Sequence, residues 1–316
     1  MPIPRLPSRP LTLIPDVVVG RAGEDPLLVE VVRPSDRSAP APAVIWLHGG
    51  GFRGSLRDGG HKGGLQYWCP FLAANGFVAI GADYRSGPDA RFPAQLNDVK
   101  TTIRWLRANA ADYGVDGRAI GVAGFSAGAV LGALAGLTAD TAELEGDGGW
   151  AGHSSRVQAV AVGSAPLDFR SVPARLAAPD AEAIYRRDPA PAIGDDALTT
   201  GRRGTGAIER MFSGSAVERE RLMTLASAVS HVRAGAPPYL IAQGTRDEIA
   251  DFAATTRFVD DMRRQGNEVE LVAIEGGYHT WDPEPGHAYP HVAYWSFGPM
   301  LVRFFGKHLQ RGGADS

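Results

Sequence analysis

The stretch Gly124-Phe125-Ser126-Ala127-Gly128 fits the pattern G-x-S-x-G. In this pattern a serine stands on a tight turn between a strand and a helix, where its hydroxyl is free to act as a nucleophile. Glycine suits the flanking positions, because a side chain two residues before or after the serine would crowd the turn. Residues 118–123 predict a short apolar strand, and residues 129–137 predict an uncharged helix. The sequence therefore presents Ser126 as a candidate nucleophile.

A chance match and a membrane helix are the two alternatives to a nucleophile in this segment. The chain contains 40 glycines, so the bare pattern can arise by chance. Residues 119–139 are also uncharged and long enough to span a bilayer. Their glycines recur at the small-residue spacing of membrane helix pairs, at Gly124, Gly128, Gly132 and Gly136. We favour a buried helix close against a sheet, because alanine and glycine give the segment little transfer energy into lipid.

A serine hydroxyl needs a base to take its proton, and the base needs an acid to fix its tautomer. His279 lies in a glycine-rich loop after the last expected strand and is the candidate base, where the alternative is a surface histidine. Asp247 follows the preceding strand and is the candidate acid, where the alternative is a solvated turn. The order serine, aspartate, histidine is the one used on sheets of this kind. Other acids could take the same role, and these are Asp168, Glu248 and Asp251.

An oxyanion formed at the substrate carbonyl needs preorganised N–H donors. Ala127, directly after the serine, is one candidate donor, and Gly50 and Gly51 in the loop His48-Gly49-Gly50-Gly51 are two others. A run of glycines can also be no more than a flexible loop. The apolar strand before this loop and the G-x-S-x-G motif downstream favour the functional interpretation. We interpret His48 as a hydrogen-bonding support for the loop and not as a base.

Strands and helices alternate along most of the chain, which predicts a mostly parallel central sheet with helices on both faces, an α/β fold. A β-hairpin over residues 12–33 comes first. Further strands are expected at residues 43–47, 77–82, 118–123, 157–162, 238–242 and 268–274. Helices are expected at residues 64–75, 93–114, 129–137, 251–265 and 290–310. The candidate residues directly follow strands, so they should gather at one edge of the sheet.

Residues 165–235 interrupt this alternation. They are rich in alanine, proline, arginine and glycine, with helices expected only near 179–187 and 215–228. We interpret them as a cap inserted into a single domain over residues 1–316, and not as a separate domain.

Composition narrows the functional classes. The chain has 316 residues, 44% of them hydrophobic, a net charge of −3 and no block of five or more basic residues, which argues against a nucleic-acid partner. Cys69, the only cysteine, lies in an apolar stretch and is expected to be a buried thiol. Prolines between positions 2 and 15 break any signal-peptide core, so we expect a cytoplasmic protein without a membrane span.

Several stretches together resemble the α/β-hydrolase esterases and lipases with a His-Gly-Gly-Gly motif, the hormone-sensitive-lipase-like and feruloyl-esterase-like carboxylesterases. They are residues 48–55, 83–85, 92–95, 98–100, 103–106, 124–128, 237–238, 244–247 and 278–279. The resemblance covers about residues 27–310 apart from the cap. It implies hydrolysis of a small-molecule carboxylic ester through an acyl-enzyme, without metal or cofactor, and leaves a homodimer open.

Two positions depart from the family pattern. Phe125 stands in the motif where many relatives carry glutamate, and Thr280-Trp281 follow His279 where Gly-Phe is more usual. Both could reshape the pocket without disabling a triad. Acyl transfer, peptide hydrolysis or a cyclisation could use the same residues. A ligand receptor on this fold is a further alternative, although receptors that resemble the family lack the histidine that this chain keeps as His279.

Overall fold

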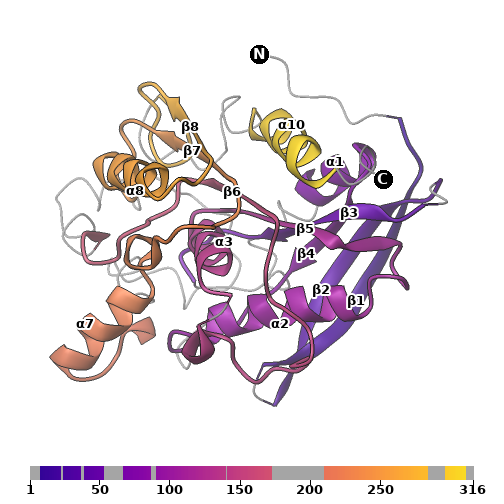
Figure 1. Ribbon diagram of the computed structural model, residues 1–316, viewed down its shortest axis with the longest axis horizontal. Helices are drawn as coiled ribbons and strands as arrows, with labels where there is room; N and C mark the ends of the chain where they lie inside the picture. Colours follow the sequence, from indigo (N-terminus) through magenta and orange to yellow (C-terminus); the bar gives the residue numbers. More distant parts are fainter. Residues whose placement is uncertain are drawn as a thin grey trace, which may run out of the picture.

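The computed structural model describes residues 8–22, 24–36, 39–52, 67–86, 90–139, 141–172, 210–283 and 296–310. Its centre is an eight-stranded sheet with the order β1-β2-β4-β3-β5-β6-β7-β8 among these residues (Figure 1). The strands are β1 (Leu11–Ala22), β2 (Asp25–Pro34), β3 (Ala41–Leu47), β4 (Val78–Ala82), β5 (Val115–Phe125), β6 (Ala159–Gly163), β7 (Tyr239–Gly244) and β8 (Val269–Ile274). β2 pairs antiparallel with β1 and β4, and all pairs from β4 to β8 are parallel. The mostly parallel sheet predicted from the sequence is confirmed.

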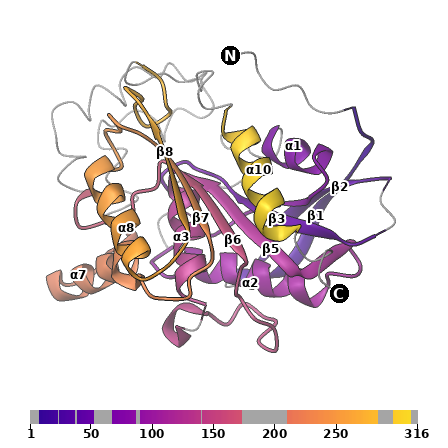
Figure 2. The ribbon, with the colours of Figure 1, turned by 45° about the horizontal axis from the view of Figure 1, so that its top comes forward.

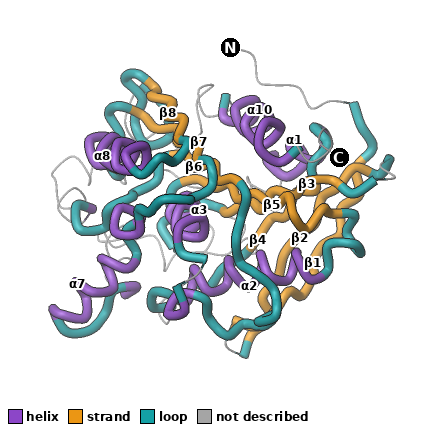
Figure 3. Tube along the Cα trace, in the orientation of Figure 1, coloured by secondary structure: helices purple, strands orange, loops and turns teal. Residues whose placement is uncertain are grey.

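Helices cover both faces of the sheet, as the alternation of strands and helices predicts. The described helices are α1 (Cys69–Ala74), α2 (Ala94–Ala108), α3 (Ala127–Leu137), α7 (Ala216–Leu225), α8 (Phe252–Arg264) and α10 (Phe297–Leu309), with short 3-10 turns at Ala142–Leu144 and Ala228–His231; α7 projects away from the sheet (Figure 1). α1 and α10 lie side by side on one face (Figure 2), whereas α2, α3 and α8 pack into the core cluster of the other face. The strands therefore run through the middle of three layers (Figure 3).

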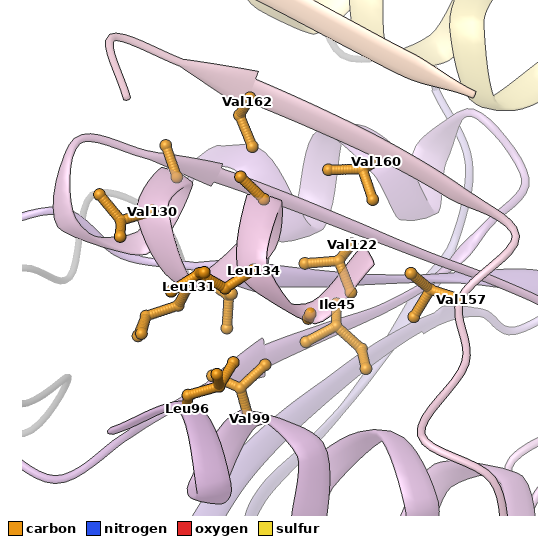
Figure 4. Packing of buried hydrophobic residues seen from close by; sticks show 14 of the residues in the cluster. Ile45, Leu96, Val99, Val122, Val130, Leu131, Leu134, Val157, Val160 and Val162 are labelled. Atoms are coloured by element: carbon orange, nitrogen blue, oxygen red, sulfur yellow. The ribbon is translucent and has the colours of Figure 1, made fainter. Parts of the chain in front are cut away.

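The two faces are built by the alternation of side chains along each strand. In β3, Ile45 and Leu47 belong to the cluster with α2 and α3, while Val44 and Trp46 belong to the cluster with α1 and α10. Figure 4 shows the first cluster, where valines of β5 and β6 face α3. Its labelled residues are Ile45, Leu96, Val99, Val122, Val130, Leu131, Leu134, Val157, Val160 and Val162.

The regularly spaced glycines at positions 124, 128, 132 and 136, which could have marked a membrane helix pair, let α3 lie close to the sheet. A Cβ on Gly132 would lie 3.2 Å from Val122 Cγ1, and one on Gly136 would lie 2.7 Å from Val160 Cγ2. Residues 119–125 belong to β5, so the uncharged segment is a strand followed by a helix. Over the described part of the chain, none of the helices has the length and apolar character needed to cross a bilayer.

Some element boundaries differ from the sequence prediction. The helix expected over residues 93–114 ends at Ala108, and the main chain then closes turns, in which Asp112 N–H donates to the carbonyl of Asn109 and Gly114 N–H to that of Ala111. β5 begins at Val115, earlier than the expected residue 118, because Val115 already pairs with Ala41 of β3 before a register shift. Cys69 is a buried free thiol, and burial raises its pKa.

Only the two ends of the expected cap fall in the described residues. Residues 165–172 lead away from β6, and α7 and the 3-10 turn after it lead back to β7. The helix expected near 215–228 is present as α7, with Ser215 accepting from Glu218 N–H at its N-terminus. Residues 173–209, including the helix expected near 179–187, lie outside the described residues. The single domain with an inserted cap stays a prediction.

Candidate active site

Ser126 stands on the turn between β5 and α3. Its backbone has φ 54° and ψ −117°, a conformation that a non-glycine residue rarely adopts, and α3 begins with the next residue. Its N–H donates to the carbonyl of Gly163, at the end of the neighbouring strand β6, at 2.9 Å. Strain of this kind persists where the surrounding structure enforces it. Here strand, turn and helix together lift the hydroxyl above the carboxyl edge of the sheet.

The two glycines of the motif are required by close backbone contacts. A Cβ on Gly124 would lie 2.6 Å from the carbonyl carbon of Gly128. A Cβ on Gly128 would lie 2.5 Å from the carbonyl oxygen of His48 and would also meet that of Leu47. The first turn of α3 therefore lies directly against the end of β3, where the glycine loop begins.

Gly128→Ala is expected to destabilise the fold, because the added methyl group meets fixed backbone atoms and not flexible side chains. We expect a loss at or above the upper end of the ~1–3 kcal/mol typical of overpacking, measured by urea unfolding. Gly152→Ala is the matched control, since a Cβ there meets nothing within 4 Å, and no loss is expected. A Gly128→Ala protein as stable as the wild type would contradict this packing.

The structure brings Ser126, His279 and Asp247 into one hydrogen-bonded line. His279 Nε2 lies 2.9 Å from Ser126 Oγ, and His279 Nδ1 lies 2.9 Å from Asp247 Oδ1. A carboxylate can only accept, so Nδ1 carries the ring proton and Nε2 is left to accept from the serine hydroxyl. Asp247 is 2% exposed and His279 is 8% exposed, so the aspartate–histidine bond is shielded from water.

The sheet explains how residues so far apart in sequence meet. β7 and β8 are parallel neighbours, with Gly244 opposite Ile274, so the loops that carry Asp247 and His279 leave the same edge side by side. Asp247 Oδ1 also accepts the N–H groups of Ile249 at 2.9 Å and Ala250 at 2.8 Å. These bonds fold the carboxylate back over its own turn and fix its direction toward the ring.

The alternative acids have other partners. Asp168 pairs with Arg170 at 2.8 Å, and although burial acts to raise its pKa, bonds from Arg170 and Ser227 lower the pKa overall. Asp251 accepts from Ala253 N–H and so caps the N-terminus of α8. Glu248 accepts the main-chain N–H of His279 at 2.9 Å and does not bond its ring in this structure. Only Asp247, among these four acids, contacts an imidazole nitrogen of His279.

The charge around His279 favours its protonated form. Burial acts to lower the pKa of the imidazole, but the negative charge and hydrogen bond of Asp247, together with the charge of Glu248, raise it above the ordinary value. Burial raises the pKa of the Glu248 carboxyl. An imidazole in this setting can hold the proton that it would take from Ser126.

The glycine loop after β3 lies against the serine turn. A Cβ on Gly49 would lie 3.1 Å from the carbonyl oxygen of Phe125 and 3.4 Å from Ser126 Cβ. Gly50 and Gly51 have φ of 114° and 63°, values at which glycine is favoured. With Ala127 at the N-terminus of α3, the three residues expected to donate N–H groups come from the two segments that meet at Ser126.

His48 supports this loop, as the sequence suggested. Its Nδ1 lies 2.7 Å from the carbonyl oxygen of Gly49, and its ring stacks on Tyr84 with centroids 4.3 Å apart. The Tyr84 hydroxyl donates to the carbonyl of His48 at 2.7 Å. Arg85 and Asp98 form an ion pair at 2.8 Å in the same region. The contacts of Tyr84 with the loop could not be read from the sequence.

The two departures from the family pattern contact one another. Phe125 and Trp281 lie edge to face with centroids 5.5 Å apart, and Phe125 also contacts the ring of His279. Trp281 Nε1 donates to Ser164 Oγ at 2.9 Å, and Ser164 Oγ donates to the carbonyl of His279 at 2.7 Å. The aromatic pair thus lies beside the histidine loop. Sequence reasoning missed Ser164, since a serine after a strand gives no distinctive signal.

The sequence holds aromatic residues that could line an acyl pocket, at positions 52, 68, 169, 185, 212, 281 and 289, although such residues more often belong to the core. Those that the structure describes belong to the core. The exposed fraction is 6% or less for Phe52, Trp68, Phe169, Phe212 and Trp281. Tyr185 and Tyr289 lie outside the described residues. Within the described ranges there is also no group of three or more histidine, cysteine, aspartate or glutamate residues arranged to hold a metal ion.

Comparison with protein-family models shows to which family this chain belongs. The BD-FAE family model matches residues 29–262, well over half of the 316 residues. The chain belongs to the BD-FAE family. Among its relatives, esterase LipC of Mycobacterium tuberculosis is 31% identical over 82% of this chain, and esterase LipQ of the same organism is 27% identical over 84%. This BD-FAE chain spans 58% of LipC and 57% of LipQ, little more than half of either relative.

Solved structures show the same fold. A truncated carbohydrate esterase from gut microbiota superposes with a TM-score of 0.72 at 22% identity, covering 98% of this chain and 99% of its own. Thermogutta terrifontis esterase 2 phosphonylated by sarin superposes with a TM-score of 0.69 at 23% identity, covering 96% of each chain. This member of the BD-FAE family therefore has the α/β-hydrolase fold, as the sequence predicted.

Proposed function

We propose that the chain is a serine hydrolase that cleaves carboxylic esters through an acyl-enzyme intermediate. The observation that carries the proposal is the unbroken line from Ser126 Oγ through His279 to Asp247, with 2.9 Å at each bond. The names of the relatives, which are esterases, support the same reaction class.

In the proposed reaction, Ser126 Oγ attacks the ester carbonyl carbon while its proton passes to His279 Nε2. Asp247 holds the ring in the correct tautomer and stabilises the imidazolium. The carbonyl oxygen becomes an oxyanion, which we assign to the N–H groups of Gly50, Gly51 and Ala127. Collapse of the tetrahedral intermediate breaks the bond to the alcohol, and His279 returns its proton to the leaving oxygen. Water then attacks the acyl-enzyme by the same sequence of steps and releases the acid.

The alternative functions differ from ester hydrolysis either in the group that accepts the acyl chain or in the bond that is cleaved, or they involve no turnover at all. An acyltransferase, peptidase or cyclase would use the same three residues with another nucleophile or bond. A receptor would not need His279 within bonding distance of Ser126, so the geometry favours catalysis. The cytoplasmic location and a homodimer stay hypotheses from the sequence.

The test is a panel of p-nitrophenyl esters of increasing acyl length, together with acetylated and feruloylated sugars, lactones and peptides. Sugar esters enter the panel because one structural neighbour is named a carbohydrate esterase. Products are analysed with and without competing amines and alcohols. We expect release of free acid from at least one ester class. Turnover confined to acceptor-dependent transfer, or no turnover with any ester, would contradict the proposal.

A further inference from the structure

The main chain of His279 is held by side chains on both sides. Its N–H donates to Glu248 Oε2 at 2.9 Å, and its carbonyl accepts from Ser164 Oγ at 2.7 Å. These partners come from the loops after β7 and β6, whereas His279 follows β8. With Asp247 on the ring, three side chains from two other loops determine where the imidazole lies.

Asp247 and Glu248 are consecutive carboxylates that hold different parts of the same histidine. Asp247 takes the ring nitrogen, and Glu248 takes the backbone amide. The turn that carries both is fixed, since Asp247 Oδ1 also accepts from Ile249 and Ala250. A shift of Glu248 would therefore move the histidine backbone relative to a stationary acid, and displacements near 1 Å can cost catalysis about 10²-fold.

Glu248 also adds negative charge beside the ring. The two carboxylates whose charges act on His279 are Asp247 and Glu248. Asp282, buried in the histidine loop, accepts from the Thr280 hydroxyl. Arg246, beside Asp247 in sequence, lies over the ring of Tyr278 at 5.1 Å. Glu275 is exposed, with its carboxylate 3.5 Å from the Thr245 hydroxyl.

We propose that Glu248 is a positioning residue for His279, which fixes the backbone of the base over Ser126 and favours the imidazolium by its charge. It touches neither the ester nor the reacting atoms, and no bond to it is made or broken. This inference rests on the proposed serine hydrolase function and assigns to Glu248 a role separate from that of Asp247.

Two variants separate the hydrogen bond from the charge. Glu248→Gln keeps an oxygen that can accept from His279 N–H but removes the charge, whereas Glu248→Ala removes both. Glu275→Gln is the matched control, because it removes the same charge from an exposed site in the same pair of loops. Active sites are counted with a fluorophosphonate, so that kcat is expressed per folded site.

For Glu248→Gln we expect kcat to stay within about threefold of wild type. The acid limb of the profile of kcat/KM against pH should move to lower pH. The sign follows from the base: kcat/KM falls when His279 is protonated, and loss of a negative charge lowers the pKa of its imidazole. For Glu248→Ala we expect the same displacement and a fall in kcat of about 10- to 10²-fold, with KM little changed. Glu275→Gln should match wild type in kcat, in KM and in the position of the acid limb.

A titration of the ring by NMR in the free protein provides a readout that does not depend on turnover. The His279 resonance is assigned by its loss in His279→Asn, and it should titrate at lower pH in Glu248→Gln than in wild type. An unmoved acid limb and an unmoved ring titration in Glu248→Gln would overturn the inference, as would an undiminished kcat in Glu248→Ala. If wild type hydrolyses no ester while the ring titration still moves, the proposed function fails and the contact between Glu248 and His279 stands.

Discussion

Ser126→Ala is expected to lower kcat for ester hydrolysis by about 10⁴-fold or more. The reason is structural: the hydroxyl that lies 2.9 Å from His279 Nε2 is the only reacting atom that the substitution removes. Alanine is tolerated at this turn no less than serine, since both carry a Cβ at φ 54°. The measurement is kcat at saturating ester, with circular dichroism to establish that the variant is folded.

Any residual activity of Ser126→Ala is compared with that of His279→Ala and of the double variant that carries both substitutions. Residues that act as one unit do not lose rate additively, so the double variant should be about as slow as either single variant. A folded Ser126→Ala protein with undiminished turnover would remove Ser126 from the mechanism. Additive losses in the double variant would show that serine and histidine act separately.

Asp247→Asn is expected to lower kcat by about 10⁴-fold, which is the loss found for the corresponding change in a serine triad. Asp168→Asn should lower kcat far less. An amide at position 247 can present N–H to His279 Nδ1 and so stabilise the tautomer that cannot accept from Ser126. Asp168 is held by Arg170 and Ser227, and its loss affects only that local pairing.

The two variants are compared at saturating ester, each with circular dichroism. They are matched, since both exchange a carboxylate for an amide in a loop after a parallel strand. A crippled Asp168→Asn with a nearly normal Asp247→Asn would move the acid to the earlier strand. That outcome would also contradict the bonds from Asp247 to the ring.

Most of the sheet could be predicted because its central strands are apolar and alternate with helices along the chain. Each expected strand from residue 43 onward is present. The position of the site followed from one topological rule, that residues after parallel strands share an edge. Ser126, Asp247 and His279 could be selected because each is a reactive side chain at such a point.

The contacts within the loops could not be predicted, because they depend on backbone paths that local sequence does not determine. Glu248 was an alternative acid, yet the turn at residues 247–250 directs it to the backbone of His279. Phe125 and Trp281 each departed from the family pattern, and only their three-dimensional contact shows that they lie together beside the histidine. The helix end at Ala108 was misjudged, because the turns that follow it, such as the bond from Asp112 N–H to the carbonyl of Asn109, depend on the path of the chain toward β5.

The most direct test of a nucleophilic Ser126 is covalent labelling by a fluorophosphonate probe, followed by intact-mass measurement and peptide mapping. We expect one probe per chain, on the peptide that contains Ser126, with slow labelling in His279→Ala and none in Ser126→Ala. Labelling on another residue, or undiminished labelling of Ser126→Ala, would contradict the account.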